Sequence, residues 1–170
     1  MSEKKIIVDE ATIDYEGLFD FVELYGLIDR FLKDKDYDKF EKKSGEQVSE
    51  EGKHIHLILV PAKWHSDYVK KHLKIEIIAR NVKEVETEID DLKVKLNKGT
   101  LKIMLSGILE TDWEGRWETR PIYYFLKKVY DKYIYRSDTD NFSAEIKEDV
   151  NLIKDQLEGF LNLQKFKQRL

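Results

Sequence analysis

The hydrophobic pattern of this chain changes its period within the stretch from Glu110 to Arg136. Before this stretch, residues such as Leu101, Ile103 and Leu105 alternate with other residues, which is typical of a β-strand. After it, apolar residues recur every three or four positions, as they do along one face of an α-helix. Strands first and helices last indicate an α+β protein in which helices cover a sheet.

Two helices are expected after this corner. Pro121 lacks an N–H and has a fixed φ, so it suits the first turn of a helix, with Thr119 as its N-cap. A second helix is predicted from about Phe142 to the end of the chain. Its apolar stripe consists of Ile146, Val150, Ile153, Leu157, Phe160 and Leu161.

The part before the corner predicts a first strand over Lys4 to Ile13 and a helix over Tyr15 to Lys33, with Asp14 as its cap. Further strands are expected over residues 37–48 (near an edge), 54–62, 69–80, 82–89 and 92–96, followed by a tight turn at 97–99 and a last strand into the corner. The short connections indicate antiparallel neighbours. We therefore predict a curved antiparallel β-meander of five to six strands. An N-terminal helix and two C-terminal helices would cover one face, in a single α+β domain spanning residues 1–170.

The second face of this sheet is expected to be partly apolar. Its central positions are Ile58, Val60, Ile78, Met104 and Ile108. A face exposed to water does not need so many apolar residues. Either the sheet curls into a partial barrel, or something covers this face.

Composition excludes several classes of protein. The chain has 170 residues, a net charge of −4 and no cysteine, so disulfides, cysteine-ligated zinc and general affinity for nucleic acid are not expected. No apolar run approaches the length of a membrane span, and the charged start MSEKKIIVDE does not resemble a signal peptide, which favours the cytoplasm. A content of 38% charged residues suits a thermophilic protein and also an ordinary, very soluble one.

The order strand, helix, meander, long helix resembles that of the START-like, or polyketide-cyclase-like, helix-grip proteins. The resemblance lies in element order over most of the chain, and no sequence motif carries it. It implies a curved sheet gripping a C-terminal helix, often around an apolar ligand. The extra helix after the meander departs from this family, and no ligand residues are carried over.

The corner also contains the densest group of candidate functional residues. Glu110 and Asp112 are two positions apart, so a strand would place them on one face beside tryptophans, where one carboxyl could act as a general acid. Arginine could then hold an anion. The alternative, which we favour, is a surface corner held by ion pairs, with the tryptophans packed beneath the helices. The acidic, basic and tryptophan residues that follow in this group are Trp113, Glu114, Arg116, Trp117, Glu118 and Arg120.

Two further groups of residues are candidate sites. His54 and His56 share a strand face and are weak candidates for a metal site, although ordinary strand histidines are the favoured interpretation and no cofactor is expected. Tyr124, Lys128 and Tyr135 combine aromatic and basic character on one helix. This combination favours a protein interface over nucleic-acid binding. The alternative, which we favour for this group, is that the tyrosines lie flat over the neighbouring helix with their hydroxyls in water.

The favoured hypothesis is a non-catalytic α+β module that binds a protein partner or itself. The alternative is a helix-grip carrier or enzyme for an apolar small molecule. The candidate ligand or interface residues are Asp112, Trp113, Glu114, Arg116, Trp117, Arg120, Tyr124, Lys128 and Tyr135.

Overall fold

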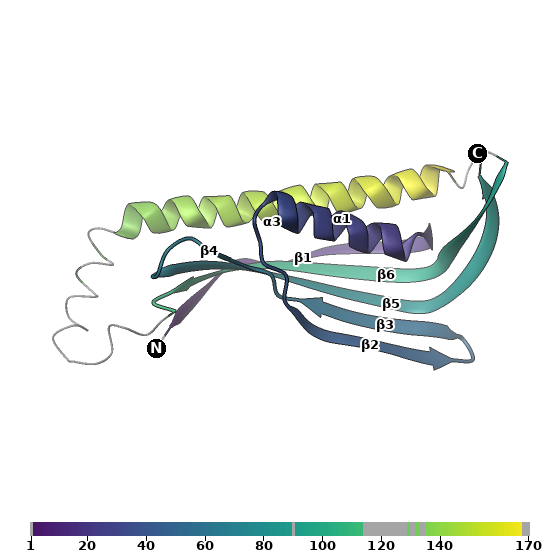
Figure 1. Cartoon of the computed structure of the whole chain (residues 1–170), viewed down its shortest axis with the longest axis horizontal. Helices are drawn as coiled ribbons and strands as arrows, with labels where there is room; N and C mark the ends of the chain where they lie inside the picture. The colour runs from purple at the N-terminus through teal and green to yellow at the C-terminus, as the bar shows by residue number, and fades with distance from the viewer. Residues whose placement is uncertain (1, 90, 114–128, 130–131, 133–134, 168–170) are drawn as a thin grey trace.

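The computed structural model describes residues 2–89, 91–113, 129, 132 and 135–167. Its described part is an α+β fold in which two helices lie on the same face of a curved antiparallel sheet (Figure 1). The helices are α1 (Phe21–Asp34) and α3 (Tyr135–Lys167). The strands are β1 (Glu3–Phe19), β2 (Glu41–Ser49), β3 (Gly52–Leu59), β4 (Ala62–Trp64), β5 (Val69–Ile89) and β6 (Leu92–Thr111).

The sheet confirms the predicted α+β meander. Strands β2, β3, β5 and β6 are successive antiparallel neighbours, β4 pairs with the start of β5, and β1 pairs with β6 to give the order β1-β6-β5-β3-β2. All nine residues of β2 are exposed, as expected for the edge strand predicted over residues 37–48. The helix predicted from Pro121 falls outside the described residues, except for Val129 and Lys132.

The strands are longer than predicted because they bend instead of ending. The expected tight turn at 97–99 is wrong: β6 runs through it, and β5 and β6 curve together at one end of the sheet (Figure 1). A register shift between Arg80 and Lys83 lies beside this bend. A Cβ on Gly99 would lie 2.8 Å from the Arg80 carbonyl oxygen, so glycine at this position permits the close approach of the two strands.

The first helix begins later than predicted. Residues from Tyr15 to Phe19 continue β1, because they pair with β6 from Leu101 down to Asn97. Asp20, and not Asp14, is the N-cap, and its carboxylate accepts a hydrogen bond from the Glu23 backbone N–H at 3.0 Å. The last helix begins at Tyr135, seven positions before the predicted Phe142.

The core lies between the sheet and the two helices. The alternation at Leu101, Ile103, Leu105 and Leu109 is confirmed, since all four side chains are buried. The predicted stripe of the last helix is also buried at Ile146, Val150, Ile153, Leu157 and Leu161. The two helices contact each other as well as the core, which fixes a layer of helices over one face of the sheet.

Candidate functional site

The face of the sheet opposite α1 and α3 is the main candidate surface, and we call it the open face. Within the described residues, no helix covers it (Figure 1). Strand alternation places apolar side chains on it because their chain neighbours, such as Leu57, Ile77 and Leu105, are buried in the core. The apolar members of the open face are Ile6, Ile58, Val60, Ile78, Met104 and Ile108.

These apolar residues are spread over several strands and alternate with polar partners, since Met104 pairs with Glu76 and Ile78 pairs with His56. Ile6 pairs with Ile108 between β1 and β6, and Ile6 is 61% exposed. The residues in the middle of the sheet are half-buried by their strand neighbours. A shallow hollow of about 390 Å³ also opens on this side, with His54, His56 and Ile78 among its lining residues. The partly apolar second face predicted from the sequence is therefore present.

Aromatic residues gather at the β4 end of the open face. Lys70 lies opposite Trp64 in the β4–β5 pairing, and its ammonium group lies 4.5 Å from the Trp64 ring and 5.7 Å from the Trp113 ring. The Phe40 ring meets the Trp64 ring edge-on at 6.0 Å. We call Phe40, Trp64, Lys70 and Trp113 the aromatic cluster. Phe40 and Trp64 are 49% and 40% exposed.

The aromatic cluster includes one predicted site residue and three that the sequence analysis did not select. Trp113 is held in place because its Nε1–H donates to the Ser66 carbonyl oxygen at 3.0 Å. Trp64 comes near it because β4 folds back on β5 through a turn around Ser66. The signal that could have found Trp64 is its position in the short connection between the strands predicted over residues 54–62 and 69–80, because a hairpin there would bring it near Lys70.

Histidine and carboxylate side chains form pairs on the open face. His72 Nε2 contacts the Glu110 carboxylate. His56 Nε2 lies 2.8 Å from one oxygen of the Glu76 carboxylate, and Lys74 pairs with the other oxygen. Hydrogen bonds from Lys74 and His56 lower the pKa of Glu76. Burial, helped by the charges of Lys70 and Lys4, lowers the pKa of His72 and outweighs the opposing effect of Glu110. Both histidines thus have carboxylate partners.

Glu110 does not have the environment of a general acid. Burial acts to raise its pKa, but the hydrogen bonds from His72 and Ser2 and the charge of Lys4 outweigh burial and lower the pKa. A lowered pKa keeps this carboxyl ionised, whereas an acid catalyst must hold its proton. The alternative interpretation of the corner, as a place held by ion pairs, agrees with these contacts.

The other predicted corner residues are only partly described. Asp112 is buried, has a positive φ of 52° and donates its backbone N–H to the Tyr68 carbonyl oxygen, so the chain turns there. Tyr135 is the first residue of α3. The candidates outside the described residues are Glu114, Arg116, Trp117, Arg120, Tyr124 and Lys128.

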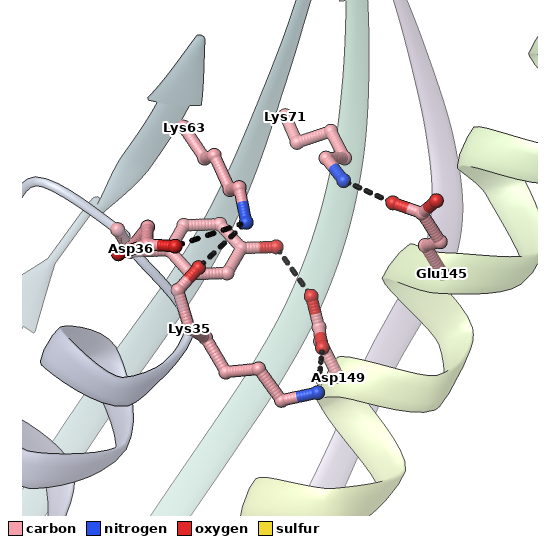
Figure 2. Close-up of polar contacts among 7 residues, drawn as sticks. Lys35, Asp36, Lys63, Lys71, Glu145 and Asp149 are labelled. Carbon is pink, nitrogen blue, oxygen red and sulfur yellow. Dashed lines mark hydrogen bonds and ion pairs between the residues drawn. The ribbon is translucent and has the colours of Figure 1, made fainter. Parts of the chain in front are cut away.

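A partly buried polar cluster on the opposite face joins the helices to the sheet (Figure 2). The Tyr37 hydroxyl donates to Asp149 at 2.8 Å, and the Lys35 ammonium lies 3.0 Å from the other oxygen of this carboxylate. On the next turn of α3, Glu145 binds the buried Lys71 of β5. Among the described residues, no buried side-chain nitrogen or oxygen lacks a hydrogen-bond partner. The cluster therefore ties α3 to the end of α1 and to β5.

The packing of α3 bears on whether a ligand cavity lies beneath it. At Gly107 of β6, an added Cβ would lie 2.3 Å from Ile146 Cγ2 and 3.2 Å from Val150 Cγ2. The helix thus rests directly on the strand, and no space for a ligand exists at this crossing.

Two absences concern the described residues alone. They contain no group of three or more histidine, cysteine, aspartate or glutamate side chains that could hold a metal ion. Nor does any helix among them combine the length and apolar character needed to cross a membrane.

In comparisons with protein-family models, curated proteins and solved structures, no match to the chain was found.

Proposed function

We propose that this protein is a non-catalytic binding module that engages a protein partner, or a second copy of itself, through the open face of its sheet. The observation that carries the proposal is the location of both described helices on one face while apolar and aromatic side chains remain exposed on the other. Apolar and aromatic side chains that remain exposed together on one face are typical of interaction sites. The cytoplasmic location expected from the amino-acid sequence is part of the same proposal.

The residue types on this face support binding to protein. Aromatic residues and methionine are enriched at protein interfaces, and tryptophan is prominent among residues that contribute most to affinity. Trp64 is held between Phe40 and Lys70, so little side-chain entropy would be lost when a partner covers it. Ion pairs such as Lys74–Glu76 lie among these apolar residues, since Glu76 pairs with Met104 across β5 and β6.

The alternative, a helix-grip carrier or enzyme for an apolar small molecule, stays a prediction from element order. The contact between Gly107 and Ile146 removes the space that such a ligand would need at the crossing of α3 and β6. For this reason we favour the open face as the site of binding.

Display selection and sedimentation together test the proposal. A library of short peptides is selected on the immobilised protein, and sedimentation velocity over a wide range of protein concentration measures self-association. Met104→Glu places a charge in the centre of the open face, and we expect it to abolish binding of selected peptides or dissociate an oligomer. Val22→Glu is the matched control, since Val22 is 81% exposed on α1, on the other side of the molecule.

The proposal requires a difference between these two variants. If the protein stays monomeric and yields no selected peptide, or if Met104→Glu and Val22→Glu behave alike while both remain folded, the open face is not a binding surface.

A further inference from the structure

The β4 end of the open face presents positive charge although the whole chain is negative. Lys4 and Lys74 have side chains that are 61% and 43% exposed. The carboxylates beside them are more covered: the Glu110 side chain is 10% exposed and the Glu76 side chain 16%. These carboxylates are also engaged with histidine and lysine. An approaching partner therefore meets mainly ammonium groups.

Lys70 adds a third cation to this surface. Its ammonium group lies over the rings of both Trp64 and Trp113, so two indoles hold it in place at the edge of exposed aromatic surface. A carboxylate that binds Lys70 would lie next to Trp64 and Phe40. An apolar side chain adjacent to that carboxylate could then pack on the same rings.

Resting on the proposed function, we propose that this end of the open face binds an acidic segment of a partner protein. Its carboxylates pair with Lys4, Lys70 and Lys74, and an apolar or aromatic side chain of the segment packs against Trp64 and Phe40. Complementary charge speeds association and selects the partner, while the apolar contact supplies affinity.

Single-stranded nucleic acid fits this surface less well, although lysine and aromatic residues can also bind it. Lys70 already lies over both indole rings, where bases would have to stack. The chain has a net charge of −4, which also disfavours the many phosphate contacts on which such binding depends.

The experiment determines the amino-acid composition of peptides selected from a random display library. The affinity of one selected peptide for the protein is then measured by fluorescence anisotropy. We expect enrichment of aspartate and glutamate next to leucine or aromatic residues. Lys70→Glu and the more exposed Lys4→Glu should each weaken binding by about ten-fold, and added salt should weaken it as well. Lys147→Glu, on an exposed position of α3, is the control for the change in charge and should bind like the wild type.

The outcomes separate this inference from the proposed function. Selected peptides that are neutral or basic, yet lose binding in Met104→Glu, would overturn the acidic partner and leave the open face as the site. Binding that is unaffected by Lys70→Glu and Lys4→Glu would overturn it too, as would tighter binding of a single-stranded oligothymidine or of a second copy of the chain. Urea unfolding of each variant shows whether it is folded. If Lys70→Glu does not fold, Lys4→Glu alone tests the inference.

Discussion

Gly107 determines how closely α3 can approach the sheet, because a side chain there would occupy the position of the Ile146 methyl group. We expect Gly107→Ala to lower the free energy of unfolding by about 1–3 kcal/mol through overpacking. Urea unfolding measures this change. The control is Gly159→Ala, where an added Cβ meets no atom within 4 Å in a helix, so that stability should rise by about 0.5–1 kcal/mol. Equal stability of Gly107→Ala and the wild type would show that the helix is not in close contact with β6.

Tyr37 is a second residue whose environment predicts a measurable effect. Burial, followed by the charge of Asp149, raises the pKa of its hydroxyl above the ordinary value of 10.0. Its contribution to stability is therefore complete below about pH 10 and is lost as pH rises further, because the unfolded chain then releases the proton and the folded chain keeps it. We expect Tyr37→Phe to lose about 1.5–3 kcal/mol near neutral pH, since the hydrogen bond goes to a charged acceptor.

The same variant should also show a shallower loss of stability in alkali than the wild type. Urea unfolding at increasing pH measures both effects. Tyr15→Phe is the comparison, because the Tyr15 hydroxyl donates to the neutral Leu18 carbonyl oxygen at 2.6 Å and its loss should cost about 1 kcal/mol. An alkaline slope of Tyr37→Phe identical to that of the wild type would contradict the burial of this hydroxyl.

At the scale of elements, the start of α1 shows how a local signal can be assigned to the wrong residue. Both Asp14 and Asp20 precede apolar residues at helical spacing. Only Asp20 caps the helix, because the pairing of β1 with β6 keeps the chain extended as far as Phe19. The Phe21 backbone N–H then donates to the Asn97 side chain at 3.2 Å, which ties the start of α1 to β6.

This difference between the two aspartates is testable. Asp20→Ala should lower the free energy of unfolding by about 1 kcal/mol, because the Glu23 backbone N–H loses its acceptor. Asp14→Ala, at an exposed strand position, should change it by less than about 0.5 kcal/mol. Thermal or urea unfolding of the two variants, measured side by side, tests this difference in stability. A larger effect at Asp14 would place the start of the helix where the sequence pattern first indicated it.

At the scale of the whole molecule, acidic side chains at separate sites should act together as pH falls. Hydrogen bonds from Lys33 and Lys39 lower the pKa of Asp29 from 3.8 to about 2. The pKa values of Glu76, Glu110 and Glu145 are also below the ordinary 4.5. A carboxyl group whose pKa is lower in the folded protein than in the unfolded chain stabilises the fold fully at pH values above its ordinary pKa. This stabilisation is lost as the pH falls through the pKa of the folded state.

We therefore expect the free energy of unfolding to fall steadily once the pH drops below about 4.5. Urea unfolding from neutral pH toward pH 2 follows this loss. High salt should reduce the part that comes from Asp29, whose ion pairs are exposed to solvent. A free energy of unfolding that stays constant down to pH 3 would contradict the pairing of these carboxylates.

The sequence by itself determined the class of this fold and the buried apolar faces of its longest elements. Alternation along β5 and β6 and the three-and-four spacing of α3 arise from the geometry of single elements, so they can be seen without knowing any partner strand. The exposed, polar character of β2 likewise predicted an edge. The partly apolar character of the second face could be predicted for the same reason, but the function of that face could not.

Only the tertiary structure decided where elements end and which distant residues meet. The end of β1 depends on its register with β6, and the bend at Gly99 depends on the neighbouring Arg80. The aromatic cluster joins Phe40, from the segment before β2, to Trp64 of β4 and Trp113 beyond β6 through Lys70. Strand order and register bring these residues together, and neither is encoded in the local period of the sequence, because a strand can satisfy the same alternation beside many different neighbours.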